Sequence, residues 1–265
     1  MKMKRNEKLG MLTGLVVGVL LLLISVFMIF QTTCKVWGAE KPANATQQGI
    51  DVSSHQGKID WEQVKNSALA DYAIIRCGYG VNQTDKDDKY WDYNSSECER
   101  LGIPYGTYLY SGADTTAKAR SEAEHVVRLL QGKNLTYPIY YDMEADMLNQ
   151  LSSTQIGNIA KTFLNTMESY GYKNVAVYSN KYLFETKLTA SVFSDYPKWI
   201  AQHSNKCTYR GSYHMWQYST QGVIPGISEK VDLNYKIGNW TYAGYSSAKK
   251  TVVVKPKATT IKSLK

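Results

Sequence analysis

The sequence predicts an α/β fold in which a parallel sheet curves into a barrel with an irregular final part. The first observation is that five strand–helix units follow one another from residue 49 onward. The second is that the helical pattern then fades, and further strands follow through loops alone. Such alternation is typical of parallel strands that are covered by helices. An open, doubly wound sheet is the alternative arrangement.

The elements follow in chain order. Asp60 is placed to cap the first helix, Gly102 to end the second and Gly132 to end the third. Thr154 is expected to cap the fourth helix, whose apolar residues from Ile156 onward recur at the spacing of one buried face. The expected strands are 50–53, 72–77, 104–110, 137–143, 175–178, 198–201, 213–218 and 230–233, and the expected helices are 59–68, 89–101, 116–131 and 154–171.

The net charge of +8 is carried by the two ends of the chain. Residues 1–40 contain five of the 31 basic groups, and residues 246–265 contain six lysines and no acid. The region between them is therefore nearly neutral. A nucleic-acid-binding protein would carry its basic charge on the folded domain, so this class is excluded. The final segment is interpreted as a solvated tail rich in Lys and Thr, and a wall-associating linker is the alternative.

The N-terminus predicts export. A basic cluster in residues 1–8 precedes an apolar run at residues 9–30, which is long enough to cross a bilayer as a helix. The basic cluster is expected to stay in the cytoplasm. The run is either an uncleaved anchor or a signal peptide that is cleaved near Gly38 and Ala39. In both cases the following linker, residues 31–46, and the domain at residues 47–245 are extracytoplasmic.

The cysteines and histidines do not form a pattern that is typical of a metal site or a redox centre. Cys77, Cys98 and Cys207 lie in the exported part, where one disulfide is possible and its pairing is left open. No Cys-x-x-Cys pair occurs and the four histidines are scattered, so we expect no metal site and no cofactor. Nucleotide-binding loops and serine-hydrolase motifs are also absent from the sequence.

Acidic residues stand at the ends of three predicted strands. Asp142 and Glu144 are two residues apart at the end of an apolar strand, so alternation places both on one face. Neighbouring carboxyl groups disfavour each other's charge, which raises one pKa and provides a proton donor near neutral pH. Asp51 lies on the first strand and Asp232 on the last, and these strands are neighbours in a closed barrel. Four such acids at one mouth point to hydrolysis of glycosidic bonds.

The chain resembles a known family, the family 25 glycoside hydrolases, which are lysozymes of the Chalaropsis type. The resemblance covers residues 49–234 and rests on an ordered series of motifs. These are GIDVSSHQG, DYAIIRCGYG, IPYGTYLYS, YPIYYDMEAD, KNVAVYSN, KWIAQ, MWQYS and VDLN.

The resemblance implies a (β/α)5(β)3 barrel and cleavage of the β-1,4 bond between N-acetylmuramic acid and N-acetylglucosamine in peptidoglycan. It implies that Glu144 is the general acid and that Asp142 orients or stabilises the substrate's N-acetyl group. Asp51 and Asp232 are implied to line the same site.

Aromatic residues near strand ends are expected to bind sugar faces. The predicted substrate-binding set is Tyr108, Tyr110, Tyr178, Trp199 and Trp216, with Gln217 as a hydrogen-bonding partner. The expected state is a monomer. A glycosidase that acts on another N-acetylated glycan, such as chitin, and a wall-binding module without turnover are the competing hypotheses.

Overall fold

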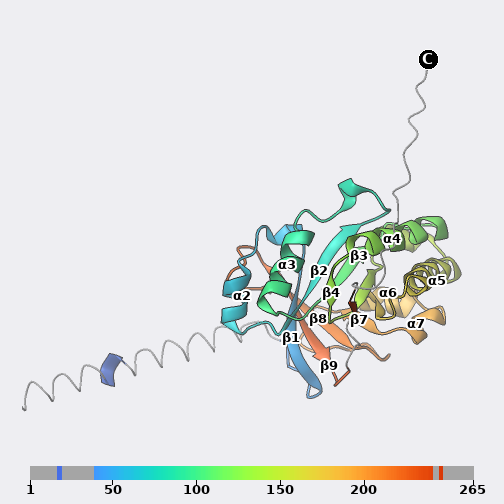
Figure 1. The fold of residues 1–265 in the computed structure, drawn as a ribbon. Helices are drawn as coiled ribbons and strands as arrows, with labels where there is room; N and C mark the ends of the chain where they lie inside the picture. The colour runs from blue at the N-terminus through green and yellow to red at the C-terminus, as the bar shows by residue number, and fades with distance from the viewer. Residues whose placement is uncertain (1–16, 20–38, 241–244, 247–265) are drawn as a thin grey trace, which may run out of the picture. The chain divides into compact units, whose positions relative to one another are not determined.

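The computed structural model describes residues 17–19, 39–240 and 245–246 (Figure 1). The predicted membrane segment, residues 9–30, lies outside this part of the chain except for one helical turn at 17–19. The basic residues 1–8, the first half of the linker (residues 31–38) and residues 247–265 of the tail also lie outside it. Within the described ranges, no helix combines the length and apolarity needed to cross a membrane.

Eight strands form a closed barrel in the order β1-β2-β3-β5-β6-β7-β8-β9. The six pairings from β1 to β8 are parallel, whereas β9 runs antiparallel to both of its neighbours, β8 and β1. The predicted barrel is confirmed, and closure excludes the open doubly wound sheet. The strands are β1 (Ala45–Val52), β2 (Tyr72–Tyr79), β3 (Tyr105–Tyr110), β5 (Ile139–Asp142), β6 (Val175–Asn180), β7 (Lys198–Ala201), β8 (Met215–Gly222) and β9 (Val231–Ile237).

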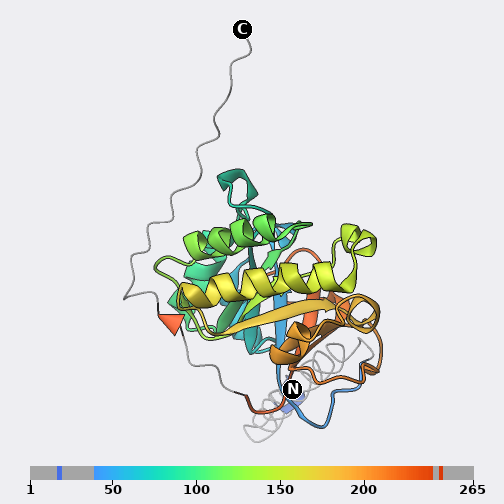
Figure 2. The same ribbon diagram turned by 90° about the vertical axis from the view of Figure 1, so that its right-hand side faces the viewer.

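Among the described residues, helices follow the first five barrel strands and none follows β7, β8 or β9, which confirms the (β/α)5(β)3 pattern. α4 and α5 lie side by side along the outside of the barrel (Figure 2). A fifth strand–helix unit was expected, but no residue range was predicted for the short helices after β6, because neither is long enough to show a helical period. The helices are α2 (Trp61–Ser67), α3 (Trp91–Leu101), α4 (Thr116–Leu129), α5 (Ser153–Ser169), α6 (Lys181–Thr186) and α7 (Val192–Asp195). A small sheet pairs β4 (Asn134–Leu135) with β10 (Tyr245–Ser246).

Local sequence explains where the helices begin and end. The Asp60 side chain accepts a hydrogen bond from the backbone N–H of Gln63 and caps α2, as predicted. Gly102 ends α3 in the left-handed conformation, with φ of 65°. The prediction that Thr154 caps α5 is wrong. Ser152 caps this helix, because it forms a capping box with Gln155 that satisfies two backbone N–H groups at once.

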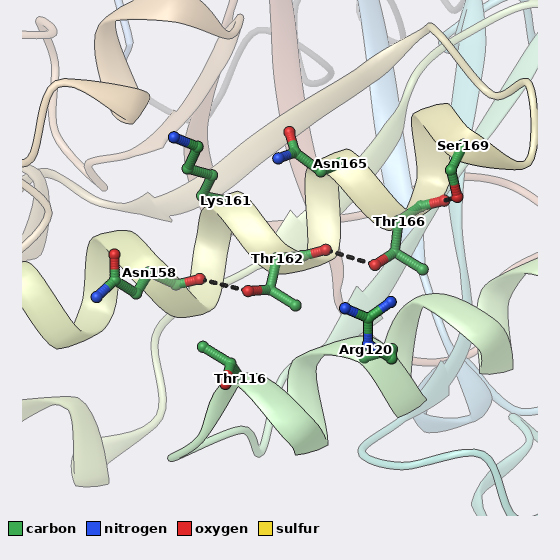
Figure 3. Close-up of a pocket in the computed structure, with 8 residues that line it drawn as sticks. All are labelled: Thr116, Arg120, Asn158, Lys161, Thr162, Asn165, Thr166 and Ser169. Atoms are coloured by element: carbon green, nitrogen blue, oxygen red, sulfur yellow. Dashed lines mark hydrogen bonds between the residues drawn. The ribbon is translucent and has the colours of Figure 1, made fainter.

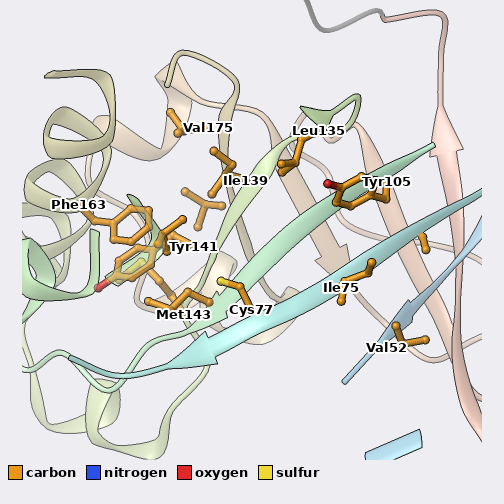
Figure 4. Packing of buried hydrophobic residues seen from close by; sticks show 14 of the residues in the cluster. Val52, Ile75, Cys77, Tyr105, Leu135, Ile139, Tyr141, Met143, Phe163 and Val175 are labelled. Carbon is orange, nitrogen blue, oxygen red and sulfur yellow. The ribbon is translucent and has the colours of Figure 1, made fainter. Parts of the chain in front are cut away.

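Alternation along the strands separates two apolar clusters. On β5, Tyr140 belongs to the cluster inside the barrel, together with Trp199 and Met215. Tyr141 faces the opposite way and stacks on Phe163 of α5, with ring centroids 3.8 Å apart (Figure 4). The next inward position after Tyr140 is therefore Asp142, which follows the interior aromatic layer at the end of the strand.

The three cysteines within the described residues do not form a disulfide. Cys77 and Cys98 are buried, Cys207 is half-buried, and all three are free thiols. Cys77 lies on β2 and Cys98 within α3, where both belong to the core between barrel and helices. These thiols therefore act as small apolar side chains.

Candidate active site

The barrel brings the four predicted acids together at one mouth. Asp51 and Asp232 are directly opposite each other on the antiparallel pair β1 and β9. Asp142 is the last residue of β5, and Glu144 follows two residues later. The charges of Asp51 and Glu144 both act on Asp142, so the two pairs share one electrostatic environment.

Asp51 and Asp232 form the deeper pair. Asp51 is 5 % exposed, and its Oδ2 accepts hydrogen bonds from Asn234 Nδ2 at 2.7 Å and from Gln217 Nε2 at 3.0 Å. The same Nε2 group lies 3.3 Å from Asp232 Oδ2. Burial and the neighbouring Asp232 raise the pKa of Asp51 well above its usual value, and burial raises the pKa of Asp232 to about 6. The pair therefore resists carrying two negative charges.

Asp142 is almost completely buried, with 2 % of its surface exposed. Burial and the neighbouring Glu144 raise its pKa well above the usual value, and Arg76 acts in the opposite direction. Its Oδ1 has no hydrogen-bond partner among the described residues. A buried carboxyl oxygen without a hydrogen-bond partner is energetically costly.

Glu144 is the more accessible member of the second pair. It is half-buried, and burial followed by the charge of Asp51 raises its pKa. His203 and the Tyr178 hydroxyl lower the same pKa. A carboxyl group with a raised pKa that still reaches solvent fits the role of a proton donor.

Gln217 connects the acids to the rest of the mouth. Its Nε2 faces the two aspartates, whereas its Oε1 accepts from the Tyr178 hydroxyl at 2.9 Å and lies 3.1 Å from His203 Nε2. The side chain is 3 % exposed. The structure therefore engages Gln217 with protein groups, in contrast to the predicted role in holding substrate.

The predicted aromatic residues divide into three tyrosines, which lie at the mouth, and two tryptophans, which are buried. Tyr108 and Tyr110 are half-buried beside the acids, so they remain candidates for contact with substrate. Tyr178 is 7 % exposed and lies at the same mouth.

Trp199 and Trp216 do not present a surface to substrate, and the prediction for both is corrected. Trp199 faces inward but is 1 % exposed, because it packs on Tyr140 and Tyr178 below the acids. Trp216 is 0 % exposed and belongs to the outer cluster, since it precedes the inward-facing Gln217 by one residue.

Three polar residues of the mouth were not predicted. Asn234 is fully buried and links Asp51 to the indole N–H of Trp199, which lies 2.8 Å from its Oδ1. Arg76 extends from β2 to Asp88 at 2.8 Å and reduces the pKa shifts at the mouth. His203 follows β7 closely. Arg76 lies at an inward position of a predicted strand, and Asn234 directly follows the predicted strand 230–233, two residues after Asp232, so strand alternation was the available signal.

A separate cavity lies outside the barrel, between α4 and α5 (Figure 3). Its volume is about 390 Å³, and it contains none of the predicted site residues. Thr162 and Thr166 donate their hydroxyl protons to backbone carbonyls of α5, so these groups are occupied. Because no acidic residue lines it, we place the chemistry at the barrel mouth. The lining residues are Thr116, Arg120, Asn158, Lys161, Thr162, Asn165, Thr166 and Ser169.

An α/β barrel that gathers several carboxyl groups at one mouth is an arrangement typical of the class of glycoside hydrolases. Within the described ranges, no group of three or more His, Cys, Asp or Glu side chains is arranged to hold a metal ion. The model of the glycosyl hydrolases family 25 matches residues 50–227. The chain therefore belongs to the glycosyl hydrolases of family 25.

A lysozyme and an autolysin are similar to this chain. The autolytic lysozyme of Clostridium acetobutylicum is 30 % identical over 188 residues, which cover 71 % of this chain and 55 % of the lysozyme. The modular autolysin LytC from Streptococcus pneumoniae, solved with a synthetic peptidoglycan ligand, is 33 % identical with a TM-score of 0.65. That match covers 71 % of this chain but only 46 % of LytC.

A family 25 glycosyl hydrolase from Bacillus anthracis shows the same fold. Its TM-score is 0.66 at 21 % identity, and the match covers 76 % of this chain and 94 % of the solved chain.

Proposed function

We propose that this protein is a peptidoglycan hydrolase, a lysozyme that cleaves the β-1,4 bond between N-acetylmuramic acid and N-acetylglucosamine. The observation that carries the proposal is Glu144, a half-buried acid with a raised pKa beside three further carboxyl groups. Membership of family 25 and the likeness to a lysozyme and an autolysin support this substrate.

In the proposed reaction, Glu144 transfers its proton to the glycosidic oxygen while the bond from that oxygen to C1 breaks. The leaving sugar departs with a neutral hydroxyl group, and water supplies the hydroxyl group of the new reducing end. The proton that water releases restores Glu144. Burial assists this step, because a desolvated carboxyl group keeps its proton at a higher pH than a solvated one.

Asp142 is proposed to stabilise the reacting sugar. Its carboxyl group is proposed to accept the N–H of the acetamido group when substrate is bound, and its negative charge would oppose the positive charge that develops at C1. Asp51 and Asp232 lie deeper, where Gln217 and Asn234 hold them. We therefore assign these two a supporting electrostatic role, with a smaller effect on turnover than Glu144.

The decisive experiment combines wall digestion with a Glu144→Gln variant. The amide keeps the size of the side chain but has no proton to give, so kcat is expected to fall by at least about 10²-fold while glycan binding survives. Mass spectrometry of the released muropeptides identifies the bond that is cut. Near-normal activity of Glu144→Gln on purified walls would contradict the assignment.

The competing functions give different products. A glycosidase for another N-acetylated glycan would release reducing ends from chitin and not from peptidoglycan. A wall-binding module of the same fold would bind walls without releasing reducing ends.

We propose that residues 47–245 form the catalytic domain and that it works outside the cytoplasmic membrane as a monomer. The apolar run at residues 9–30 behind a basic cluster supports export, either as an anchor or as a cleaved signal peptide. Protease added to intact protoplasts is expected to remove the domain, and full protection would contradict the proposal.

A further inference from the structure

The backbone of Asp142 and Glu144 is held from both neighbouring strands. On the β6 side, the buried Ser179 hydroxyl donates a hydrogen bond to the Met143 carbonyl at 2.6 Å. On the β3 side, the Ser111 N–H donates to the Asp142 carbonyl at 2.9 Å. Ser111 is the first residue after β3, so the position of the acid pair depends on the loop that begins there.

This loop is held in turn by Glu122 of α4. The Glu122 side chain is 0 % exposed, and its Oε1 accepts the Gly112 N–H at 2.7 Å. Its Oε2 lies 2.9 Å from Ser111 Oγ and 2.6 Å from the Tyr141 hydroxyl oxygen. These two hydroxyl oxygens lie 2.8 Å apart. One buried carboxyl group outside the barrel therefore joins the loop after β3 to the residue that precedes Asp142.

The contacts of Glu122 fit both charge states of its carboxyl group. Burial raises the pKa of Glu122, and its hydrogen bonds, first that of the Tyr141 hydroxyl, oppose this shift. Oε1 accepts from Gly112 whether or not the group is ionised. The hydroxyl groups of Ser111 and Tyr141 can donate to a carboxylate or accept from a neutral acid. The network therefore holds the loop without requiring a charge on Glu122.

We propose that Glu122 is a positioning residue: by holding Ser111 and Gly112, it fixes the N–H group that supports the Asp142 carbonyl and so keeps the acid pair in its working position. Glu122 acts through the loop and has no contact with substrate, because it is fully buried. The assignment rests on the proposed function, since the pair that Glu122 positions is the one proposed to cleave the glycan. Displacing a catalytic group by about 1 Å can reduce the rate by about 10²-fold.

A purely structural role for Glu122 predicts a different result. Loss of the side chain would then lower the free energy of unfolding, but the folded protein would keep its kcat. The hydrogen bond from the Ser111 N–H to Asp142 would also stay as closed as in the wild type. Turnover of the folded protein and hydrogen exchange of the Ser111 N–H therefore separate the two roles.

The experiment compares the wild type with Glu122→Leu and Glu122→Gln on a soluble peptidoglycan fragment. Glu122→Leu removes both oxygens, so kcat is expected to fall by at least about tenfold with little change in KM. Exchange of the Ser111 N–H, measured by NMR, is expected to become about tenfold faster, the effect of losing about one hydrogen bond. Glu122→Gln is expected to restore both values, because the amide oxygen can accept from Gly112 and the amide nitrogen can bind the hydroxyl oxygens. Glu124→Leu, at a half-buried position of the same helix, is the matched control without either effect.

A second variant tests the network if Glu122→Leu does not fold. Ser111→Ala removes one hydroxyl contact with Glu122 and keeps the N–H that donates to Asp142, so smaller changes in the same directions are expected. A wild-type kcat or an unchanged exchange rate at position 111 in the folded variant would overturn the inference. A wild type that releases no reducing ends would refute the proposed function. The exchange measurement needs no turnover, so it would still show whether Glu122 fixes this loop.

Discussion

The Asp142→Asn substitution tests the electrostatic coupling at the mouth. It removes a buried negative charge two residues from Glu144 and keeps the shape of the side chain. The charge of Glu144 raises the pKa of Asp142 by repulsion between the two carboxyl groups. The same repulsion acts on Glu144, so its pKa is expected to fall when the charge of Asp142 is removed.

The sign follows from the role of Glu144 as an acid. Activity requires its protonated form and is lost as the pH rises through its pKa. Removing the like-charged neighbour lowers that pKa, so the alkaline limb of the profile is expected to move to lower pH.

The assay is the pH dependence of kcat/KM on a soluble glycan, which reports the groups of the free enzyme. The value of kcat is also expected to fall, because the charge that stabilises the reacting sugar is lost. An alkaline limb that stays in place or moves to higher pH would show that Asp142 does not raise the pKa of Glu144.

Three further predictions concern stability and binding. Burial raises the pKa of Asp232 from 3.8 to about 6, so the folded state loses stability as the pH rises through this range. The Asp232→Asn substitution is therefore expected to increase the free energy of unfolding by about 2 kcal/mol, measured by urea unfolding at pH 7. An unchanged free energy of unfolding would contradict this prediction. Phe163→Ala should cost about 3–5 kcal/mol in the same assay, because its ring is fully buried; Lys161→Ala, exposed on α5, is the control. Deleting residues 246–265 is expected to weaken binding to anionic cell walls at low salt and to leave activity on soluble glycans unchanged. Loss of that activity would show that the tail is part of the fold.

The sequence predicted most of the barrel because its strands are short, apolar and separated by clear stop signals. It also predicted the four acids, since each belongs to an ordered motif. The helices after β6 could not be located in the sequence, because α6 and α7 are too short for a helical period to show. Trp216 was misassigned although the information was present: Trp216 and Gln217 are consecutive strand residues and cannot both face the interior.

Polar contacts at the mouth were harder to predict than the acids. Asn234 and His203 acquire their roles from partners on other strands, and pairing across a barrel cannot be deduced from residue type. Asn234 shows this clearly, because it contacts Asp51 from 183 positions away. The burial of Trp199 was equally hard to predict. An inward strand position fits both a tryptophan that stacks on a sugar and a tryptophan that is buried in the core.

The antiparallel strand β9 has a consequence for how this enzyme is made. Asp51 is near the start of the domain and Asp232 near its end. The deeper acid pair therefore forms only when β1 and β9 meet, which brings together two strands that are separated by almost the whole domain sequence. Closing such a loop is entropically costly and belongs to late, high-contact-order steps of folding. A chain in which β9 has not yet paired therefore holds Asp142 and Glu144 without the Asp51–Asp232 pair. The electrostatic environment of the mouth is complete only when this final strand has joined β1.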